Sequence, residues 1–334
     1  MISNCFYYGG YTPEGYYSLA AKPTFYAGRN YAVKSCRPSV KQRFFDRISA
    51  ELENRGQDFT LFRTDCGNDG VFSKASDLRI VDGTYGAFDE EMFIPIDLDG
   101  EIIECAQPIL KKRDEAVKRA VRFLSACQCI LGDMSRLESA NIDIAKVNRF
   151  SSRLWSQTGG IMKGTVGTEH KRFVSCFTSD GVELDTSAFD DYCDRVTVIC
   201  DRTGVCARRI TDRVRRYALS AGYDIISCIC PMNPELGAEH IIIPELRYGI
   251  FVNKFYHKAE FPQGSKTFSA RFMLDSTESK NRMDFSFKAY KRLMQEVFSS
   301  LEVVEYCDSE LDKVEANENT DEIVSNVLHK FFSY

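Results

Sequence analysis

The sequence predicts an α/β protein made of two tandem domains of one kind, each a Rossmann-like parallel sheet layered with helices and carrying an appended helical hairpin. Three observations predict this fold class. The chain has 334 residues, more than the roughly 250–300 at which one hydrophobic core stops growing. Its first half repeats in its second half. Within each half, short apolar runs alternate with amphipathic helical segments, as in parallel sheets.

The repeat is visible when FYYGGYTPEG (6–15) is placed over RFVSCFTSDG (172–181). Thr12 then meets Thr178, an offset of 166 residues (178 − 12). Further matches are Arg29 with Arg195, Arg43 with Arg209, Gly56 with Gly222 and, after a two-residue shift, DLRI (77–80) with ELRY (245–248).

A change of composition separates the two copies. The stretch SQTGGIMKGTVGTEH (156–170) is rich in glycine and threonine and is typical of a linker. We therefore expect a first domain at residues 1–158 and a second at residues 168–334.

The elements of the first copy follow from its apolar pattern. A strand is expected at 31–35, and a helix at 41–54 places Phe44, Phe45, Ile48 and Leu52 on one face. Gly56 falls just past that helix, where a residue with positive φ ends the spiral at low steric cost. Two further strands are expected at 59–63 and 78–81.

The second copy shows the same order. Strands are expected at 196–200, 225–229 and 246–252, and the intervening helix turns Ile210, Val214, Tyr217 and Ala221 inward. Long charged helices are expected at 109–131 and 285–304, followed by shorter ones at 141–155 and 317–332. Each long and short pair should form the helical hairpin of its own copy, and Asp143 is placed as a helix N-cap.

Composition excludes several classes of protein. The formal net charge of −5 gives no general attraction to nucleic acid or to a membrane surface. No apolar run approaches the ~20 residues needed to span a bilayer, and MISNCFYYGG lacks the features of a signal peptide. We expect a cytoplasmic protein with no membrane contact. The thirteen cysteines and four histidines show no metal-ligand spacing, so reduced, mostly buried cysteines and no metal site are expected.

The first strand-to-helix turn is the main candidate for a binding site. Phosphate-binding turns have the form G-x-x-x-x-G-K-[ST], in which glycines let backbone N–H groups converge on the anion. The corresponding residues here are Ser35, Cys36, Arg37, Pro38, Ser39, Val40, Lys41 and Gln42. The lysine is present, but both glycines are replaced and Pro38 removes an N–H donor.

The second turn departs further from that form. Its residues are Asp201, Arg202, Thr203, Gly204, Val205, Cys206, Ala207 and Arg208. Ala207 takes the lysine position and Arg208 the hydroxyl position. Asp201 would bring negative charge toward a phosphate, while Gly204 still permits a tight turn.

Segments outside the turns point to a family. They are RGQDFTLFRTDC (55–66), LRIVDGT (78–84), AGYDIISCICPMNPE (221–235) and IIIPELRYGIF (241–251). They resemble the RGYDV helix end, the cysteine-bearing segment and the IPELxxAIVDGT strand of an uncharacterised bacterial family of tandem P-loop ATPase-like proteins. In that family each half carries a GGPGTGKS-like or GRPGTGKS-like loop. The resemblance covers nearly the whole chain, helical hairpins included, and implies a P-loop NTPase-like fold for each half.

The resemblance also implies roles for particular residues. Lys41 would be the phosphate lysine, Asp82 the acidic residue near magnesium, and ATP with Mg²⁺ the cofactor of the first half. Asp82 is equally well explained as the turn former of an Asp-Gly pair, and Asp65 and Asp69 offer further carboxylates. In the second half the position aligned with Asp82 is Ile250, so that half lacks the lysine, the hydroxyl and the acid.

Three hypotheses follow. The first is a degenerate tandem P-loop protein, a pseudoenzyme without efficient NTP hydrolysis, that binds a protein partner or a second copy of itself. The second is an active ATP-dependent enzyme that uses Lys41 and Asp82 in a non-standard loop. The third is a nucleic-acid module that uses the arginine face Arg208–Arg216, although such faces more often pair with acids, and residues 307–322 offer them.

Overall fold

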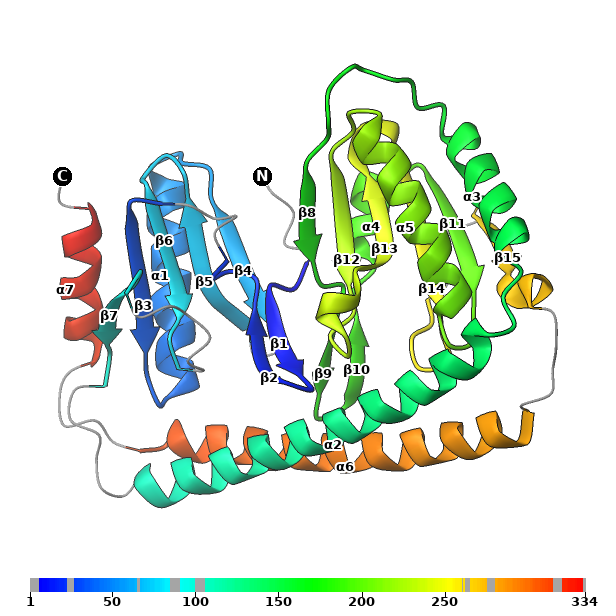
Figure 1. Ribbon diagram of the computed structural model, residues 1–334. Coiled ribbons are helices and arrows are strands. Elements are labelled where there is room, and N and C mark those ends of the chain that lie inside the picture. Colours follow the sequence, from blue (N-terminus) through cyan, green and yellow to red (C-terminus); the bar gives the residue numbers. More distant parts are fainter. Residues whose placement is uncertain are drawn as a thin grey trace. The chain divides into compact units, whose positions relative to one another are not determined.

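The computed structural model is a mixed α/β fold that divides into two compact units (Figure 1). It describes residues 6–22, 27–64, 67–84, 91–99, 106–259, 261, 265–274, 280–314 and 320–332. Unit 1 comprises Met1–Arg122, Phe177–Gly181 and Val297–Tyr334, and unit 2 comprises Phe123–Cys176 and Val182–Glu296. The units are therefore not the consecutive stretches 1–158 and 168–334 expected from the repeat.

Unit 1 is built on a five-stranded sheet in the order β4-β5-β6-β3-β7. Its strands are β3 (Arg29–Lys34), β4 (Thr60–Thr64), β5 (Gly67–Ser73), β6 (Leu78–Asp82) and β7 (Ile94–Asp97). The helix α1 (Pro38–Asn54) follows β3, and a hairpin of β1 (Gly9–Thr12) and β2 (Gly15–Ser18) precedes it.

Unit 2 is built on a six-stranded sheet in the order β15-β11-β14-β13-β12-β8. Its strands are β8 (Glu169–Arg172), β11 (Arg195–Cys200), β12 (Ile225–Ile229), β13 (Ala238–Ile243), β14 (Tyr248–Asn253) and β15 (Lys266–Ser269). The helix α5 (Val205–Ser220) follows β11, and a short helix α4 (Ser187–Tyr192) precedes it. A separate pair of strands, β9 (Ser175–Thr178) and β10 (Gly181–Leu184), is divided between the units, because Phe177–Gly181 belong to unit 1.

The two sheets share one strand order, because β4-β5-β6-β3-β7 corresponds to β12-β13-β14-β11-β15. The strands β3, β6 and β7 are parallel, as are β11, β14 and β15. However, β5 and β13 run antiparallel to both of their neighbours. The sheets are thus mixed and not parallel as expected. Two residues separate β4 from β5, too few for the crossover that a parallel neighbour requires.

The helix that follows the first strand of each sheet buries the face predicted for it. In α1 the side chains of Phe44, Phe45, Ile48 and Leu52 are fully buried with Val33 and Ile80 of the sheet. In α5 the side chains of Ile210 and Val214 are fully buried. Ala218 completes that face, whereas Tyr217, which was expected inside, is half-buried.

Two long helices belong to both units. The helix α2 (Gln107–Ser139) passes from unit 1 into unit 2 after Arg122, and α6 (Lys280–Leu311) passes back after Glu296. Both extend beyond the predicted segments 109–131 and 285–304. Within unit 1, Arg113 Nε donates to Asp308 Oδ1 at 2.5 Å, so α2 and α6 are joined by a buried ion pair.

The shorter helices cover the sheet of the other repeat. The helix α3 (Ile144–Thr158), which follows α2, packs on α5 in unit 2 through Val147, Phe150 and Leu154. Its N-cap is Asp143, as predicted, and the carboxylate accepts from Lys146 N at 3.0 Å.

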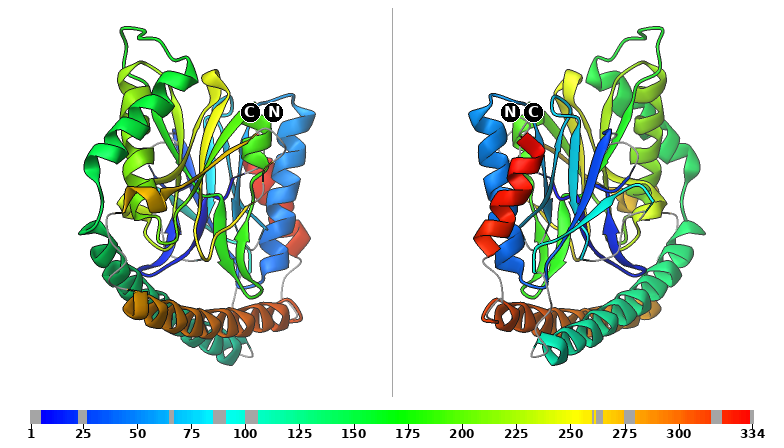
Figure 2. Two further views of the ribbon diagram at one scale, coloured as in Figure 1. Left: turned by 90° about the vertical axis from the view of Figure 1, so that its right-hand side faces the viewer. Right: turned by 90° about the vertical axis from the view of Figure 1, so that its left-hand side faces the viewer.

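The helix α7 (Thr320–Phe332), which follows α6, packs on α1 in unit 1 through Val324 and Phe331 (Figure 2). Arg29 Nη1 and Arg55 Nη2 also donate to the carbonyls of Phe331 and Phe332. The hairpins expected on the parent sheets are therefore exchanged. A helix of 33 residues is about 50 Å long, so α2 carries the chain well past its own sheet.

The stretch between α3 and β8 is held against unit 2. Lys163 N donates to Ala221 O at 3.0 Å, and Gly167 N donates to Leu219 O at 2.8 Å. A Cβ at Gly167 would lie 1.9 Å from Tyr223 O, so only glycine permits this close approach. The linker expected at 156–170 is thus shorter, because α3 extends to Thr158 and β8 begins at Glu169.

Over the described ranges, no helix combines the length and the apolar character required to cross a bilayer. Most of the described cysteines are buried, as expected, and Cys129 on α2 is exposed. None of these described cysteines forms a disulfide.

Candidate functional site

Each unit has a cluster of buried polar side chains where its parallel strands end at their carboxyl termini. The first cluster consists of Ser35, Cys36, Arg37, Lys41, Asp82 and Asp99 in unit 1. The second cluster consists of Cys230, Glu239, His240, Lys254, Tyr256 and His257 in unit 2. Ligands of open α/β sheets bind at this edge, so both clusters were compared with the residues expected from the sequence.

The first strand-to-helix turn is shorter than the span predicted for it. β3 ends at Lys34 and α1 begins at Pro38, so Ser35, Cys36 and Arg37 alone form the turn. The other predicted loop residues are helical, because a proline in the first helical position has the required φ and no N–H to satisfy. Val40 is buried in the core of unit 1.

The donors of this turn bind a carboxylate of the chain itself. Asp99 accepts from Ser35 Oγ at 2.7 Å, from Arg37 Nε at 3.2 Å and from the backbone N of Cys36. A second carboxylate, Asp312 at the end of α6, accepts from Ser39 N at 2.9 Å. The positive end of α1 is therefore compensated from two directions.

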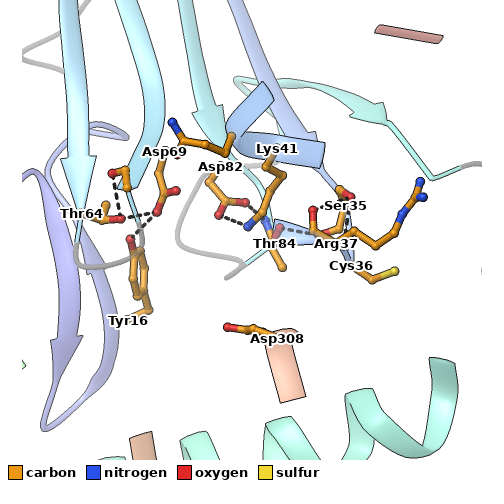
Figure 3. Close-up of polar contacts among 12 residues, drawn as sticks. Tyr16, Ser35, Cys36, Arg37, Lys41, Thr64, Asp69, Asp82, Thr84 and Asp308 are labelled. Carbon is orange, nitrogen blue, oxygen red and sulfur yellow. Dashed lines mark hydrogen bonds and ion pairs between the residues drawn. The ribbon is translucent and has the colours of Figure 1, made fainter. Parts of the chain in front are cut away.

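Lys41 and Asp82, the candidate phosphate lysine and the candidate magnesium acid, lie together. The ammonium Nζ of Lys41 donates to Asp82 Oδ2 at 2.6 Å, and the two side chains are 7% and 3% exposed. Figure 3 shows them pointing toward one another from α1 and β6. Asp82 Oδ1 accepts from Thr84 N at 2.7 Å, so the expected turn at Asp-Gly is formed as well.

The remaining candidates of unit 1 have structural contacts. Asp69 accepts from Thr64 Oγ1 at 2.6 Å and faces Tyr16 OH at 3.5 Å (Figure 3), while Asp65 lies outside the described residues. Gln42 binds Asp46 at 2.7 Å and accepts from Asn68 N at 3.1 Å. Burial, together with Asp99, raises the pKa of Cys36 to about 12, so its sulfur is a thiol and a poor nucleophile.

The second turn is also closed by a carboxylate of the chain. Asp201 Oδ2 accepts from Ala207 N at 2.8 Å, which places the carboxylate at the start of α5. Gly204 has φ of 83°, which confirms the tight turn expected there. Val205, Cys206 and Ala207 are buried in the core of unit 2, and Arg208 N donates to Gly204 O at 2.9 Å within the first turn of α5.

Lys254 occupies the space beside this turn. A Cβ at Gly204 would lie 2.3 Å from Cε of Lys254, so the lysine packs directly on the glycine. The ammonium Nζ lies 2.5 Å from Glu239 Oε1, and the two side chains are 2% and 3% exposed. Burial alone would raise the pKa of Glu239, but the Lys254 charge, with His257, lowers it well below its ordinary value.

Both long helices hold the second turn. Thr203 Oγ1 donates to Glu138 Oε2 in the last turn of α2. Arg202 Nη2 donates to Asp284 of α6 at 3.3 Å, and its guanidinium lies 3.6 Å from the ring centre of Phe287.

Glu239, His240 and His257 were tested as metal ligands, because their donor atoms lie within 4.8 Å of one another. The set does not fit a metal ion. His240 Nδ1 accepts from Val252 N at 2.9 Å, so its Nε2 carries the proton and has no lone pair to offer. The Lys254 ammonium already neutralises Glu239. We therefore assign the second cluster to a buried ion pair beside a neutral His240, because burial lowers the pKa of this imidazole well below its ordinary value.

Strand register corrects the alignment of the two halves. Asp82 pairs with Val33, and the equivalent pair in unit 2 is Val252 with Ile199. Asp82 therefore corresponds to Val252 and not to Ile250, because the repeat gains two further residues before β14. The second half still lacks an acid at this position.

Strand register also shows that Asp69 of β5 and Glu239 of β13 occupy equivalent positions in the two sheets. Val71 pairs with Ile80 in unit 1, and Ile241 pairs with Ile250 in unit 2. Each acid stands two residues before its reference residue, so both units carry a carboxylate at one position of the antiparallel strand.

The arginine face of α5 is partly paired within unit 2. Arg215 donates to both carboxylate oxygens of Glu169 at 2.9 and 2.7 Å, and Arg216 pairs with Asp212. The acids that pair with Arg215 and Arg216 are Glu169 and Asp212, whereas part of the stretch 307–322 proposed from the sequence lies outside the described residues.

Sequence reasoning missed Asp99, Lys254 and Glu239, which decide the chemistry of both turns. Each of these residues lies far in sequence from the turn that it affects, so no local motif predicts its role. A buried-looking glutamate and lysine beside apolar runs, as in GAEHIII and IFVNK, were the available signal.

Comparisons with family models, with curated proteins and with solved structures find no match to this chain.

Proposed function

We propose that this protein is a degenerate tandem P-loop NTPase-like protein that acts by binding or assembly and not by efficient NTP hydrolysis. The observation that carries the proposal is the occupation of both helix starts by the chain's own carboxylates, Asp99 at α1 and Asp201 at α5. A nucleotide phosphate would have to displace a fixed negative charge from these amides. The shared strand order of the two sheets supports an origin by duplication.

Two lysine contacts support the loss of phosphate binding. Lys41, the candidate phosphate lysine, is neutralised by Asp82 at 2.6 Å. In unit 2, Lys254 packs on Gly204 and is neutralised by Glu239. The charge of each ammonium is therefore already compensated by a carboxylate of the chain and does not attract a triphosphate.

The test is calorimetric titration of the full chain with Mg·ATP and, separately, Mg·GTP. We expect no saturable heat at nucleotide concentrations that saturate P-loop enzymes. Micromolar binding that Lys41→Ala abolishes and Lys313→Ala preserves would overturn the proposal, because Lys313 is an exposed lysine far along the chain. Sedimentation with and without nucleotide then measures assembly.

An active ATP-dependent enzyme that uses Lys41 and Asp82 is the second candidate. It is favoured by the contact of these two side chains at the carboxyl end of β6. Under this hypothesis Lys41→Ala lowers phosphate release by orders of magnitude, since the transition state loses its main cation. Unchanged release in that variant excludes it.

The nucleic-acid hypothesis has less support. Arg215 and Arg216 of the Arg208–Arg216 face already bind Glu169 and Asp212. Binding to DNA or RNA that weakens steeply with salt, and that Arg208→Ala with Arg209→Ala removes, would favour it over the first proposal.

A further inference from the structure

One acidic side chain on a long helix meets the second strand-to-helix turn in a setting that opposes its charge. Glu138 lies in the last turn of α2 and accepts from Thr203 Oγ1 in the turn between β11 and α5. The carboxyl is half-buried, and the helix ends one residue later. The group therefore has a short path to solvent.

We propose that Glu138 is a proton-controlled latch. Its neutral carboxyl holds the end of α2 against the turn Asp201–Gly204, and its ionised carboxylate withdraws toward water and frees the turn. The latch operates within unit 2 and does not depend on whether either unit binds a nucleotide.

The charges around Glu138 favour its neutral form. Asp201, on the same turn, has the same sign and cannot move away, because its carboxylate is bound to Ala207 N at 2.8 Å. Arg202 has the opposite sign, but its guanidinium is shared with Asp284 and lies over Phe287. Cys206, at the start of α5, is uncharged, since burial raises the pKa of its thiol to about 12. The ionised Glu138 carboxylate is therefore repelled by Asp201 and is only partly compensated by Arg202, which also binds Asp284.

The titration range follows from these contacts. Burial, and in smaller part Asp201, raises the pKa of Glu138 to about 7, although the Thr203 hydroxyl opposes the rise. A group with this pKa is mostly neutral at pH 6 and mostly ionised at pH 8. The latched fraction should fall about tenfold between those two values.

Hydrogen exchange of the full chain tests the latch. The amides of residues 203–208 are followed from pH 6 to pH 8, and each rate is divided by its intrinsic rate at the same pH. We expect wild-type protection to fall several-fold, up to about tenfold. In Glu138→Gln, an isosteric neutral side chain, protection should stay constant.

Two further variants separate the latch from general effects of pH. Asp133→Asn removes a half-buried acid of the same helix, paired with Arg136 at 3.4 Å, and should keep the wild-type dependence. Asp201→Asn should lower the midpoint of Glu138, read by NMR of its carboxyl carbon, because the like charge is gone. A wild-type midpoint near the ordinary value of a glutamate, or a full pH dependence in Glu138→Gln, would overturn the proposal.

Discussion

At the carboxyl ends of its strands, unit 1 pairs Lys41 of α1 with Asp82 of β6, whereas unit 2 pairs Lys254, just beyond β14, with Glu239 of β13. Both contacts are buried and both join one ammonium to one carboxylate. The lysine comes from the helix in one unit and from the strand end in the other. The charge balance of the cluster is therefore common to the two units, while the residue positions that provide it are not.

The starts of α1 and α5 differ in a related way. Asp99 reaches the first turn from the segment after β7 and accepts from three donors, whereas Asp201 belongs to the second turn and accepts from Ala207 N. In both units a carboxylate of the chain thus lies where a bound anion such as phosphate would lie. In unit 1 this carboxylate, Asp99, is distant in sequence from the turn, and in unit 2 it is Asp201 of the turn itself. We expect the long-range contact to contribute more to stability.

The largest expected effect is the loss of stability on replacing the buried lysine of each unit, and it should differ between Lys254 and Lys41. Lys254→Met should lower the free energy of unfolding by about 3–5 kcal/mol, because Glu239 is left charged and buried. Lys41→Met should cost less, about 2–3 kcal/mol, since Asp82 keeps the Thr84 amide as a donor at 2.7 Å. Urea unfolding at pH 7 measures both values.

Lys313→Met is the matched control, because its pair with Glu310 has a lysine that is 70% exposed. It should leave the free energy of unfolding nearly unchanged, because an exposed ion pair contributes little to stability. Equal losses in Lys254→Met and Lys41→Met would contradict the difference that we draw between the clusters.

The next largest loss of stability is expected on replacing Gly204, on which Lys254 packs. Gly204→Ala should cost about 2–4 kcal/mol, because φ is 83° and the new methyl group would overlap Cε of Lys254. Gly56→Ala, also at positive φ but with no atom within 4 Å, should cost about 1–2 kcal/mol. If thermal unfolding gives the same loss for both, Lys254 does not pack as described.

A smaller difference is expected between the two helix starts. Asp99→Asn should cost about 1.5–3 kcal/mol, since a charged acceptor of three donors becomes neutral. Asp201→Asn should cost less than about 1 kcal/mol, because an asparagine oxygen accepts from the start of a helix nearly as well as an aspartate oxygen. Denaturation at pH 6 is the appropriate measurement, and a reversed order would show that the local contact dominates.

The smallest effect depends on pH and belongs to unit 2. The pKa of Glu138 is raised in the folded chain to about 7, so its contribution to stability is complete below about pH 4.5 and is lost as pH rises through 7. Glu138→Gln should therefore be more stable than the wild type at pH 8 by up to about 1 kcal/mol, because solvent screening reduces the effect of the full shift. The two proteins should have similar stability at pH 5, and a constant difference between pH 5 and 8 would contradict the assignment.

Local pattern predicted the elements well. The runs at 31–35, 59–63 and 225–229 correspond to β3, β4 and β12, and the apolar faces of α1 and α5 lie where their periodicity placed them. Lys41 and Asp82 were singled out because they match positions of the family that the sequence resembles, and their side chains are in contact. The elements and their apolar faces depend on residues close together in the chain.

Features that depend on distant residues were not predictable from one sequence. The strand β13 was missed because residues 241–243 alone form an apolar run within it, after the charged and polar Glu239 and His240. The contacts of Asp99 with Cys36 and of Lys254 with Gly204 form only after the strands are aligned in register. The exchange of α3 and α7 depends on the rigidity and length of α2 and α6, which hydrophobic pattern does not report.

The packing of α7 on α1 also constrains biosynthesis. The ribosome makes α1 early, but residues 320–332 emerge only after every strand of both sheets. At translation rates of about 5–20 residues per second, the flank of α1 that Val324 and Phe331 cover stays exposed for roughly 15–55 s. The unit encoded second can thus mature before the unit encoded first, whose nascent surface is open to chaperones during that interval.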